Sequence, residues 1–549
     1  MPFDQTVFTP FVHPVKPSPE FSKSVAYFSM EFAIDQSLKT YSGGLGFLAG
    51  SHMRSAHDLG QNLIGIGILW KYGYYDQDRK QDNSMEVEFR EKIYHFLIDT
   101  QIRTTIEVGG QSIWVHAYYL PPEVFKTAPL FFLTTDTEGN DYHARSISYS
   151  LYDSNPRTKA VQSSVLGIGG VKILEAMGCT PDVYHFNEAH ALPGAFQLYQ
   201  QYKSVEKVKE HLVFTTHTPE EAGNEKHDFE FLNQLGFFAG LPISTVQEIT
   251  KQKTSVFNHT LAALRLSRKA NGVSRLHGEV ARKMWGDYPD ICGIDSITNS
   301  QNKAYWADPV LEEGRQTRDV ALIASRKKEL KKELFKTVAN QCGKLFDPEV
   351  LTIVWARRFT GYKRADLLIE DTERFASFMR NSKYPVQMIW AGKPYPKDDT
   401  AIQLFNRLHY LSHYYKNIAV LTGYELALSK LLKDGSDVWL NTPVVTREAS
   451  GTSGMTAAMN ASINCSTFDG WICEFGRNEE NAFLIPVAHG DNINQQDRDQ
   501  LFTMLETTIL PMYYDEPEKW QQIILTSMND VGEYFDSDRM AREYYEKLY

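Results

Sequence analysis

The chain has 549 residues, more than the roughly 250–300 at which a single hydrophobic core stops growing, so we expect two domains. Its apolar content of 42% and charged content of 23% are typical of a globular protein, and a net charge of −11 argues against nucleic-acid binding. Five scattered cysteines without CxxC spacing predict reduced thiols, with neither a disulfide framework nor a zinc site built on cysteine.

The start of the chain, Met1-Pro-Phe-Asp, lacks the basic and then apolar pattern of a signal peptide. The best apolar run, residues 63–70, is far shorter than the about 20 residues that a membrane helix needs. Residues 1–22 contain five prolines, which predicts an extended arm. Together these features predict a cytoplasmic protein that makes no membrane contact.

The first half of the chain begins its regular structure with an apolar strand at residues 25–32. A glycine-rich loop, Ser42-Gly-Gly-Leu-Gly46, follows, and a helix is expected over residues 52–59. Glycines in such a loop let a ligand approach the backbone closely, although tight packing explains most isolated glycine-rich turns. Further strands are predicted at residues 63–70, 106–119 (a hairpin), 129–135, 182–186 and 212–216, with a helix at 159–177.

Two of these strands end in polar residues, Asn187-Glu-Ala-His190 and His217-Thr-Pro219. In α/β sheets, ligands bind at the carboxyl ends of parallel strands, so these residues are candidates for a site. A core histidine bonded to the backbone is the alternative, and for His190 alone it is the preferred one. Residues 220–228 predict a mobile loop, residues 257–285 predict helices, and the domain crossing is placed near residue 305.

The second half shows the βα alternation more plainly. A basic helix is predicted at residues 326–342, and strands are predicted at 351–356, 386–391 and 417–421, which implies a parallel, doubly wound sheet. The first strand is followed by Arg357-Arg358-Phe-Thr-Gly-Tyr-Lys363-Arg364, with four cations in eight residues. A solvated face is the ordinary explanation for such a run, and a site for a phosphate-sized anion is the alternative.

The segment at residues 448–454, Glu-Ala-Ser-Gly-Thr-Ser-Gly, lies between a predicted strand at 437–443 and a predicted helix at 455–463. A small-residue loop before a helix directs backbone N–H groups at one spot, where the helix dipole favours an anion. Glu448 would repel that anion, so we expect it to face sugar hydroxyls instead. A capped helix after an ordinary loop is the alternative. After residue 498 the chain is predicted to be mostly helical, with breaks at Pro511 and Pro517.

Together these motifs resemble those of the α-glucan phosphorylases, chiefly the shorter bacterial kind. The matching motifs follow the family's order over nearly the whole chain: Tyr27-Phe-Ser-Met-Glu-Phe32, Ser42-Gly-Gly-Leu-Gly46, Asn187-Glu-Ala-His190, Thr216-His-Thr-Pro219, Asn271-Gly-Val-Ser274, residues 358–364, Tyr424, residues 448–455 and Asp469-Gly-Trp471. The resemblance implies an α/β fold of the GT-B type, with two Rossmann-like domains facing a cleft. Residues 1–305 would form the acceptor domain, residues 306–525 the phosphate domain, and residues 526–549 a helix returning to the first domain.

Family members transfer a glucosyl unit between an α-1,4-glucan and phosphate with retention of configuration. By position, the resemblance assigns catalytic roles to four residues: His217, Arg358, Lys363 and Glu448. It assigns substrate contacts to seven others: Gly43, Gly44, Leu45, Asn271, Tyr424, Ser450 and Gly451. No metal ion is implied. The implied partners are an α-glucan or maltooligosaccharide together with phosphate, glucose 1-phosphate or a sugar nucleotide, and a homodimer is left open.

The chain departs from the family at the cofactor position. Phosphorylases carry pyridoxal phosphate on a lysine directly after the Gly-Met that closes the loop, and here Gly454-Met455 is followed by Thr456. A threonine hydroxyl cannot form a Schiff base. Thr452 and Thr456 therefore mark a cofactor position where binding is noncovalent or absent. Three functions stay open: a phosphorylase-like transferase, a cofactor-independent transferase using a nucleotide sugar, and an inactive glucan-binding homologue.

Overall fold

The computed structural model describes residues 8–549, so residues 1–7 of the expected N-terminal arm lie outside the described residues. The chain divides into two compact units, which we describe separately. Within the described residues, unit 1 comprises residues 8–74, Phe89–Asn299 and Ser537–Tyr549, and unit 2 comprises Tyr75–Glu88 and Ser300–Asp536.

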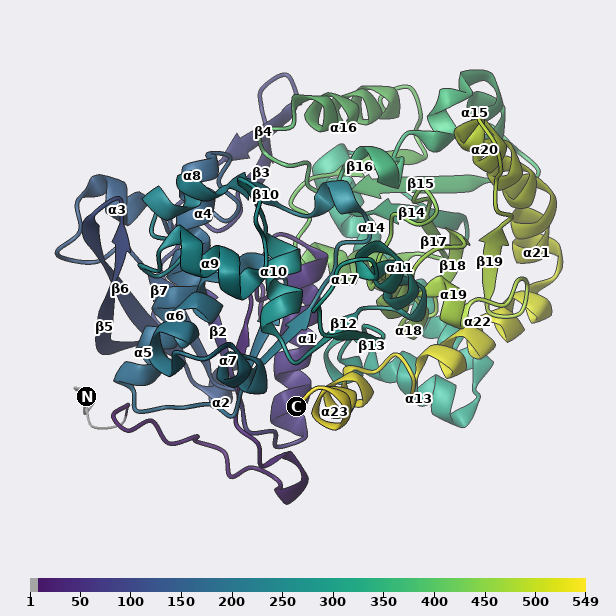
Figure 1. Ribbon diagram of the computed structural model, residues 1–549. Helices are drawn as coiled ribbons and strands as arrows, with labels where there is room; N and C mark the ends of the chain where they lie inside the picture. Colours follow the sequence, from purple (N-terminus) through teal and green to yellow (C-terminus); the bar gives the residue numbers. More distant parts are fainter. Residues whose placement is uncertain (1–7) are drawn as a thin grey trace. The chain divides into compact units, whose positions relative to one another are not determined.

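Unit 1 is built on a nine-stranded sheet in the order β13-β12-β9-β8-β1-β2-β7-β6-β5, which is parallel from β13 to β7 (Figure 1). The hairpin β5–β6 joins antiparallel to β7. The strands are β1 (Val25–Phe28), β2 (Leu63–Ile68), β5 (Ile98–Val108), β6 (Gln111–Leu120), β7 (Leu130–Thr134), β8 (Val183–Asn187), β9 (Leu212–Thr215), β12 (Lys269–Gly272) and β13 (Gly293–Ser296), with a separate antiparallel pair β10 (Lys226–Asp228) and β11 (Val256–Asn258).

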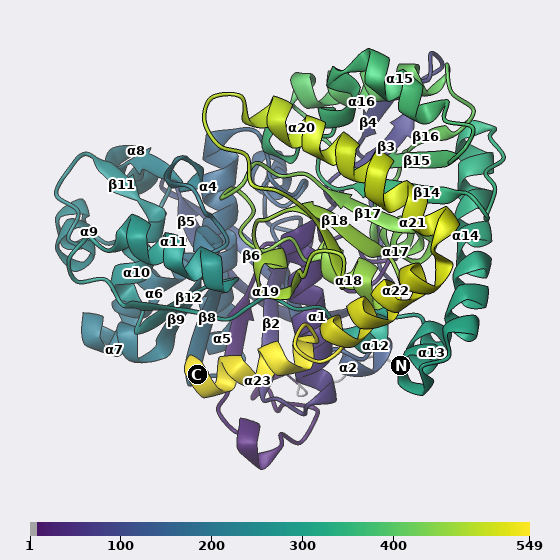
Figure 2. The ribbon, with the colours of Figure 1, turned by 90° about the vertical axis from the view of Figure 1, so that its right-hand side faces the viewer.

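The helices of unit 1 are α1 (Gly44–Asp58), α2 (Pro122–Phe125), α3 (Tyr142–Ser146), α4 (Pro156–Ser164), α5 (Gly170–Ala176), α6 (Pro193–Tyr202), α7 (Val205–His211), α8 (Phe229–Gln234), α9 (Ile243–Thr250), α10 (His259–Leu266), α11 (Arg275–Trp285) and α23 (Ser537–Lys547). Helices α1 and α23 lie side by side and pack their apolar residues on one face of the sheet (Figures 1 and 2). The core there combines Val25 and Tyr27 of β1 with Met53 of α1 and Tyr544 of α23.

Unit 2 contains a six-stranded, fully parallel sheet in the order β16-β15-β14-β17-β18-β19. Its strands are β14 (Leu351–Ala356), β15 (Val386–Ala391), β16 (Ile418–Leu421), β17 (Val438–Asn441), β18 (Ile463–Thr467) and β19 (Ala482–Ile485). Successive side chains of a strand point to opposite faces, and β14 shows the result. Ile353 and Trp355 enter one apolar cluster, and Val354 and Ala356 enter another. The sheet is therefore covered on both faces, as parallel sheets require.

The helices of unit 2 are α12 (Lys303–Trp306), α13 (Pro309–Thr317), α14 (Val320–Cys342), α15 (Thr372–Met379), α16 (Asp399–Ser412), α17 (Leu426–Gly435), α18 (Ser453–Met459), α19 (Ile472–Phe475), α20 (Ile493–Met504), α21 (Leu510–Asp515) and α22 (Pro517–Val531). The ends of α14 show how the sequence sets these bounds. Asp319 caps the first turn through Leu322 N, and Gly343 ends the helix in the left-handed conformation at φ 64°.

Residues 75–88 lie inside the range predicted for the first domain but belong to unit 2. Strands β3 (Asp76–Arg79) and β4 (Met85–Glu88) pair with each other, and Met85 joins an apolar core of unit 2. Gln77 Nε2 donates to Gly392 O at 2.9 Å, and Met85 N donates to Asn406 Oδ1 at 2.8 Å. These bonds attach residues 75–88 to unit 2.

Several local predictions were wrong in detail. Helix α1 begins at Gly44, inside the predicted loop, and strand β12 occupies residues predicted to be helical. Residues 226–228, predicted to be part of a loop, form β10. Pro511 does not end a helix, because a π-helical turn at Leu505–Ile509 precedes it and α21 continues through it. Among residues 8–549, no helix is both long enough and apolar enough to cross a bilayer.

Candidate active site

Three loops at the carboxyl edge of the unit 2 sheet meet around Glu448. They follow β14, β17 and β18, which are neighbours in the sheet and run in the same direction. Parallel strands end at the same edge, so residues distant in sequence come together there. The first loop supplies Arg357 and Lys363, the second supplies Glu448, and the third supplies Asp469.

The central contact is an ion pair between Lys363 and Glu448. Lys363 Nζ lies 2.7 Å from Glu448 Oε2, and Arg357 Nη1 lies 4.0 Å from the same oxygen. The side chains of Lys363 and Glu448 are only 13% and 9% exposed. Burial by itself would raise the pKa of Glu448, but the neighbouring cations, Lys363 and Arg357 foremost, outweigh it and hold the pKa below its ordinary value. Glu448 is therefore a buried carboxylate that stays ionised.

A second carboxylate, that of Asp469, holds the backbone of this loop. Its Oδ2 accepts from Glu448 N at 2.8 Å, and its Oδ1 accepts from Gly470 N at 2.9 Å. Burial, with a contribution from the charge of Glu448, raises the pKa of Asp469 to about 7. The two neighbouring carboxylates thus differ in protonation near neutral pH, because only Glu448 has cations beside it.

The four cations after β14 have different surroundings. Arg357 is buried, and its Nη1 and Nη2 donate to Asn441 Oδ1 and Leu440 O. Arg364 is also buried and bonds to Thr442 O and Pro443 O, with an ion pair to Asp497 at 2.7 Å, so its role is structural. Arg358 is exposed, yet its charge is among those that lower the pKa of Glu448. A solvated basic face therefore does not describe this segment.

The same loops contain buried polar atoms without a hydrogen-bond partner in the described part of the chain. They are Arg357 Nε, Thr360 Oγ1 and Ser450 Oγ. Buried polar atoms in native proteins nearly always have partners, so three in adjoining loops mark a place that suits an oxygen-rich ligand. The predicted substrate residue Ser450 is one of these three.

Gly451 and Tyr424 are the other predicted substrate residues in unit 2. Gly451 has φ 86°, which favours glycine, and a Cβ there would lie 3.3 Å from Glu448 Cγ. Tyr424 is buried, and its hydroxyl lies 3.4 Å from Ala356 O at the end of β14 and 3.2 Å from Ser429 Oγ. Gly451 therefore leaves room for the Glu448 side chain. Tyr424 contacts the end of β14, at the same carboxyl edge of the sheet.

In unit 1, the glycine-rich loop is held by Glu31. Ser42 N and Gly43 N donate to Glu31 Oε2 at 2.6 and 3.1 Å, and Tyr152 Oη donates to Glu31 Oε1 at 2.6 Å. A Cβ on Gly43 or Gly44 would meet no atom within 4 Å, whereas one on Gly46 would lie 2.6 Å from Tyr41 Cβ.

The glycines of this loop therefore serve two purposes. Gly46 is required by packing, and Gly43 and Gly44 leave open space over the first turn of α1, where Leu45 is half-buried. The N–H groups of that turn have no partner within the helix. This part of the loop can accept a ligand against its backbone.

His217 follows β9 at the carboxyl edge of the unit 1 sheet. Its Nε2 lies 2.6 Å from Asn187 Oδ1, which only accepts hydrogen bonds, so the ring carries its proton on Nε2. Burial, helped by His277 and His190, lowers the pKa of His217 to about 3. The predicted contact Asn271 is fully buried, and its Oδ1 and Nδ2 bond to Thr215 Oγ1 and Gly272 O. His217 is thus a neutral imidazole near the edge, and Asn271 is engaged inside the sheet.

The cofactor position does not fit a covalently attached pyridoxal phosphate. Thr456 is buried in α18, and its hydroxyl donates to Ser453 O at 3.1 Å; Thr452 is the residue just before this helix. Two other buried or half-buried lysines of unit 2 are engaged elsewhere. Lys393 lies 2.9 Å from Glu425 Oε1, and Lys430 donates to Trp306 O at 2.7 Å. Residue 456 supplies no amine for a Schiff base.

Comparison with known proteins agrees with this geometry. A model of the carbohydrate phosphorylase family matches residues 311–506. An uncharacterised protein of Methanocaldococcus jannaschii is 45% identical over 96% of this chain and 100% of its own length. A maltodextrin phosphorylase of Thermococcus litoralis is 32% identical over 97% of this chain and 71% of its own length. A glycogen phosphorylase of Mycobacterium tuberculosis is 30% identical over 96% and 70%. The parallel α/β sheets are those of the predicted GT-B fold, and the chain belongs to the carbohydrate phosphorylase family.

Proposed function

We propose that the protein is a retaining glucosyltransferase that moves a glucosyl unit between the end of an α-1,4-glucan and phosphate. Carbohydrate phosphorylases are hexosyltransferases, and they typically depend on pyridoxal phosphate. The observation that carries the proposal is the buried Lys363–Glu448 pair with Arg357 at 4.0 Å. Under this proposal, phosphate is assigned to these cations and sugar hydroxyls to the carboxylate beside them.

The roles of these groups follow from the reaction. In phosphorolysis the bond between C1 of the glucosyl unit and the glycosidic oxygen breaks, and a bond between C1 and a phosphate oxygen forms on the same face. A proton from the phosphate passes to the departing glucan oxygen. The transition state resembles an oxocarbenium ion and needs the phosphate charge fixed close to C1.

Lys363, Arg357 and Arg358 would hold and neutralise the phosphate. Lys363 presents a compact ammonium, and the arginines present planar donor forks that match phosphate oxygens. Glu448 would accept hydrogen bonds from two hydroxyls of the glucosyl ring, with Ser450 Oγ as a further polar partner. Asp469, which holds the backbone at Glu448, would position that carboxylate. Thr456 offers no amine, so these roles are assigned without any step through pyridoxal phosphate.

In unit 1, the open loop at Gly43 and Gly44 and the neutral ring of His217 would serve the glucan. A neutral imidazole suits hydrogen bonding to sugar hydroxyls. It carries no charge, so it does not attract phosphate and its burial costs little free energy. The predicted role of Asn271 becomes that of a support, since its amide is engaged inside the sheet.

One observation favours a second candidate. A threonine at position 456 removes the amine that attaches pyridoxal phosphate, whereas a nucleotide sugar brings its own diphosphate to the cations. A cofactor-independent transferase using UDP-glucose or ADP-glucose is therefore the alternative. An inactive glucan-binding protein is less favoured, because sugar binding alone does not need buried cations.

Glucose 1-phosphate release from a maltooligosaccharide and phosphate tests the proposal. We expect Lys363→Met to abolish it, and we expect Lys397→Met, at an exposed lysine after β15, to leave it unchanged. Melting-temperature shifts separate the donors, because a ligand that binds only the native state stabilises it. A shift with UDP-glucose or ADP-glucose, but none with glucose 1-phosphate, would replace the first candidate by the second. An absorbance band of pyridoxal that survives dialysis would support the first.

A further inference from the structure

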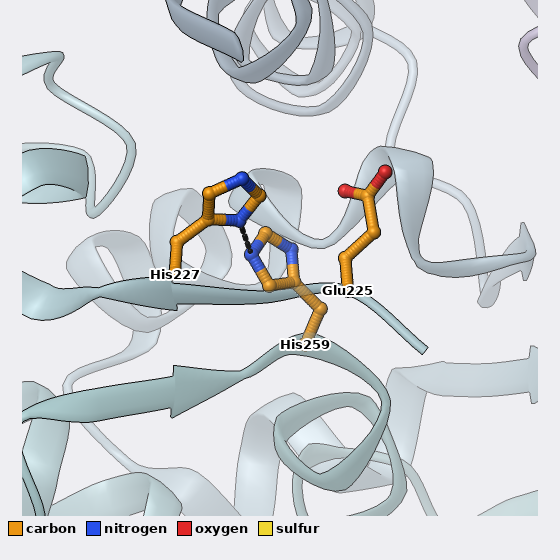
Figure 3. A group of neighbouring side chains, drawn as sticks. All are labelled: Glu225, His227 and His259. Carbon is orange, nitrogen blue, oxygen red and sulfur yellow. Dashed lines mark hydrogen bonds between the residues drawn. The ribbon is translucent and has the colours of Figure 1, made fainter. Parts of the chain in front are cut away.

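A cluster of one carboxylate and two imidazoles lies in unit 1 and includes none of the residues assigned a role above. Glu225, His227 and His259 place one ligand atom each within 4.8 Å of the others. His227 Nδ1 and His259 Nε2 are 3.0 Å apart (Figure 3). From this geometry we propose that the three residues bind a divalent transition-metal ion of the zinc class.

The pairing of β10 and β11 explains why the three side chains share one face. Glu225 and His227 are two residues apart along an extended segment, so they point the same way. His259 N donates to Glu225 O at 3.1 Å, which continues the antiparallel register in which His227 faces Phe257. His259 therefore stands directly opposite Glu225, and directly opposed side chains lie on the same face.

The separation of the two rings suits a shared ion. Zinc–nitrogen bonds of about 2.0–2.1 Å at a tetrahedral angle separate two nitrogens by about 3.3–3.4 Å. The two nitrogens now share a hydrogen bond, so an ion would replace the shared proton, and the nitrogens need to move apart by only a few tenths of an ångström. Two histidines and one carboxylate form the ligand set of several zinc and iron centres, and this set leaves a fourth position for water.

Aromatic side chains fix the orientation of both rings. His259 is buried and lies in edge contact with Phe237 and Phe257, at centroid distances of 5.0 and 5.2 Å. His227 stacks on Phe231 at 5.7 Å. Rings held by packing lose little freedom on binding, which favours affinity.

Lys159 is the group that competes with the ion. Its ammonium pairs with Oε1 of Glu225. An ionised carboxylate has about four lone-pair sites on its two oxygens, so Glu225 can contact both Lys159 and a metal. Lys159 still repels a divalent cation, so its removal is expected to tighten metal binding. A polar cluster with a purely structural role gives no such result.

The consequence for the fold is local. A metal at this place joins the start of β10 to the first residue of α10, across the antiparallel pair. We expect the ion to stabilise the second half of the predicted mobile loop at residues 220–228, which supplies Glu225 and His227.

The test uses the full chain, stripped with a chelator and titrated with Co²⁺ and with Zn²⁺. We expect one ion per chain and a visible Co²⁺ spectrum typical of four ligands. His227→Ala and Glu225→Gln each remove one ligand and should weaken binding by at least about 100-fold, since even outer-shell changes cost 10–100-fold. Lys159→Met should tighten binding about 10-fold. His143→Ala, at an exposed histidine of α3, is the matched control and should change nothing.

Three results would overturn the proposal. One is the absence of a Co²⁺ spectrum in the unaltered chain, and another is equal affinity in His227→Ala and His143→Ala. The third is a Lys159→Met protein that binds the ion more weakly. His227 is half-exposed, and Glu225→Gln preserves the shape of the side chain, so both variants are expected to fold. Circular dichroism without metal checks this.

Discussion

Glu448→Gln should bind inorganic phosphate more tightly while transferring glucose more slowly. In the structure Glu448 occupies one side of the Lys363 ammonium at 2.7 Å, where a phosphate would compete for the same cation. Glutamine keeps the shape of the side chain and removes its charge. The variant therefore separates two roles that removal of the whole side chain would confuse.

The size of the effect follows from the geometry of the ammonium. Two acceptors on one tetrahedral ammonium, each about 2.7 Å from the nitrogen, are about 4.5 Å apart. Two unit negative charges at that distance repel by about 0.9 kcal/mol in water and by about 3.7 kcal/mol at an effective dielectric constant near 20. Removing the carboxylate should therefore tighten phosphate binding by at least about 5-fold. Hydrogen bonds to a charged group are worth about 1.5–3 kcal/mol, so transfer should slow by about 10- to 150-fold.

Isothermal titration with phosphate measures the first effect, and release of glucose 1-phosphate from a maltooligosaccharide measures the second. Glu373→Gln, at an exposed glutamate of α15, is the matched control and should leave both unchanged. Weaker phosphate binding by Glu448→Gln would refute the reasoning. It would mean that the carboxylate organises the cations and does not compete with phosphate for them.

The remaining predictions concern protonation, the cofactor and packing. The pKa of Asp469 is raised from 3.8 to about 7, so the native chain retains a proton that the unfolded chain loses. Stability should therefore fall as pH rises from about 4 to 7, by at most about 4 kcal/mol, and urea unfolding of Asp469→Asn should lack this contribution. Thr456→Lys should capture pyridoxal phosphate with an imine absorbance band, and absence of the band would show that the surrounding pocket also differs. Gly50→Ala should lower the melting temperature strongly because its Cβ would lie 2.0 Å from Ala33 O, whereas Gly44→Ala should not; equal melting temperatures would contradict this packing.

Sequence patterns predict best where a segment is buried on both sides. Strands β14 and β15 have the bounds predicted for them, because all six residues of each strand are buried and turn residues flank them. Strand β12, Lys269-Ala-Asn-Gly272, has almost no β-forming side chains. It is a strand because β9 and β13 pair with it on both sides, and that pairing overrides local preference.

The candidate site could be predicted as a region but not as a set of contacts. The basic run after β14 was recognised, yet Arg357 and Arg358 are neighbours in sequence and only the structure shows which is buried. The role of Asp469 depends on the meeting of two loops that follow different strands. The cluster of Glu225, His227 and His259 depends on strand pairing, although the short pattern Glu-x-His was visible in the sequence.

The position of α23 has a consequence for synthesis on the ribosome. Residues 300–536 form most of unit 2, but residues 537–549 return to unit 1, where Tyr544 and Tyr549 complete an apolar core. His185 in β8, beside the central strand β1, has its Nδ1 2.6 Å from Tyr549 Oη. Unit 1 therefore cannot complete this core until residues 300–536 of unit 2 have been synthesised. A nascent chain that stalls before residue 537 would expose an unfinished core to chaperones and proteases.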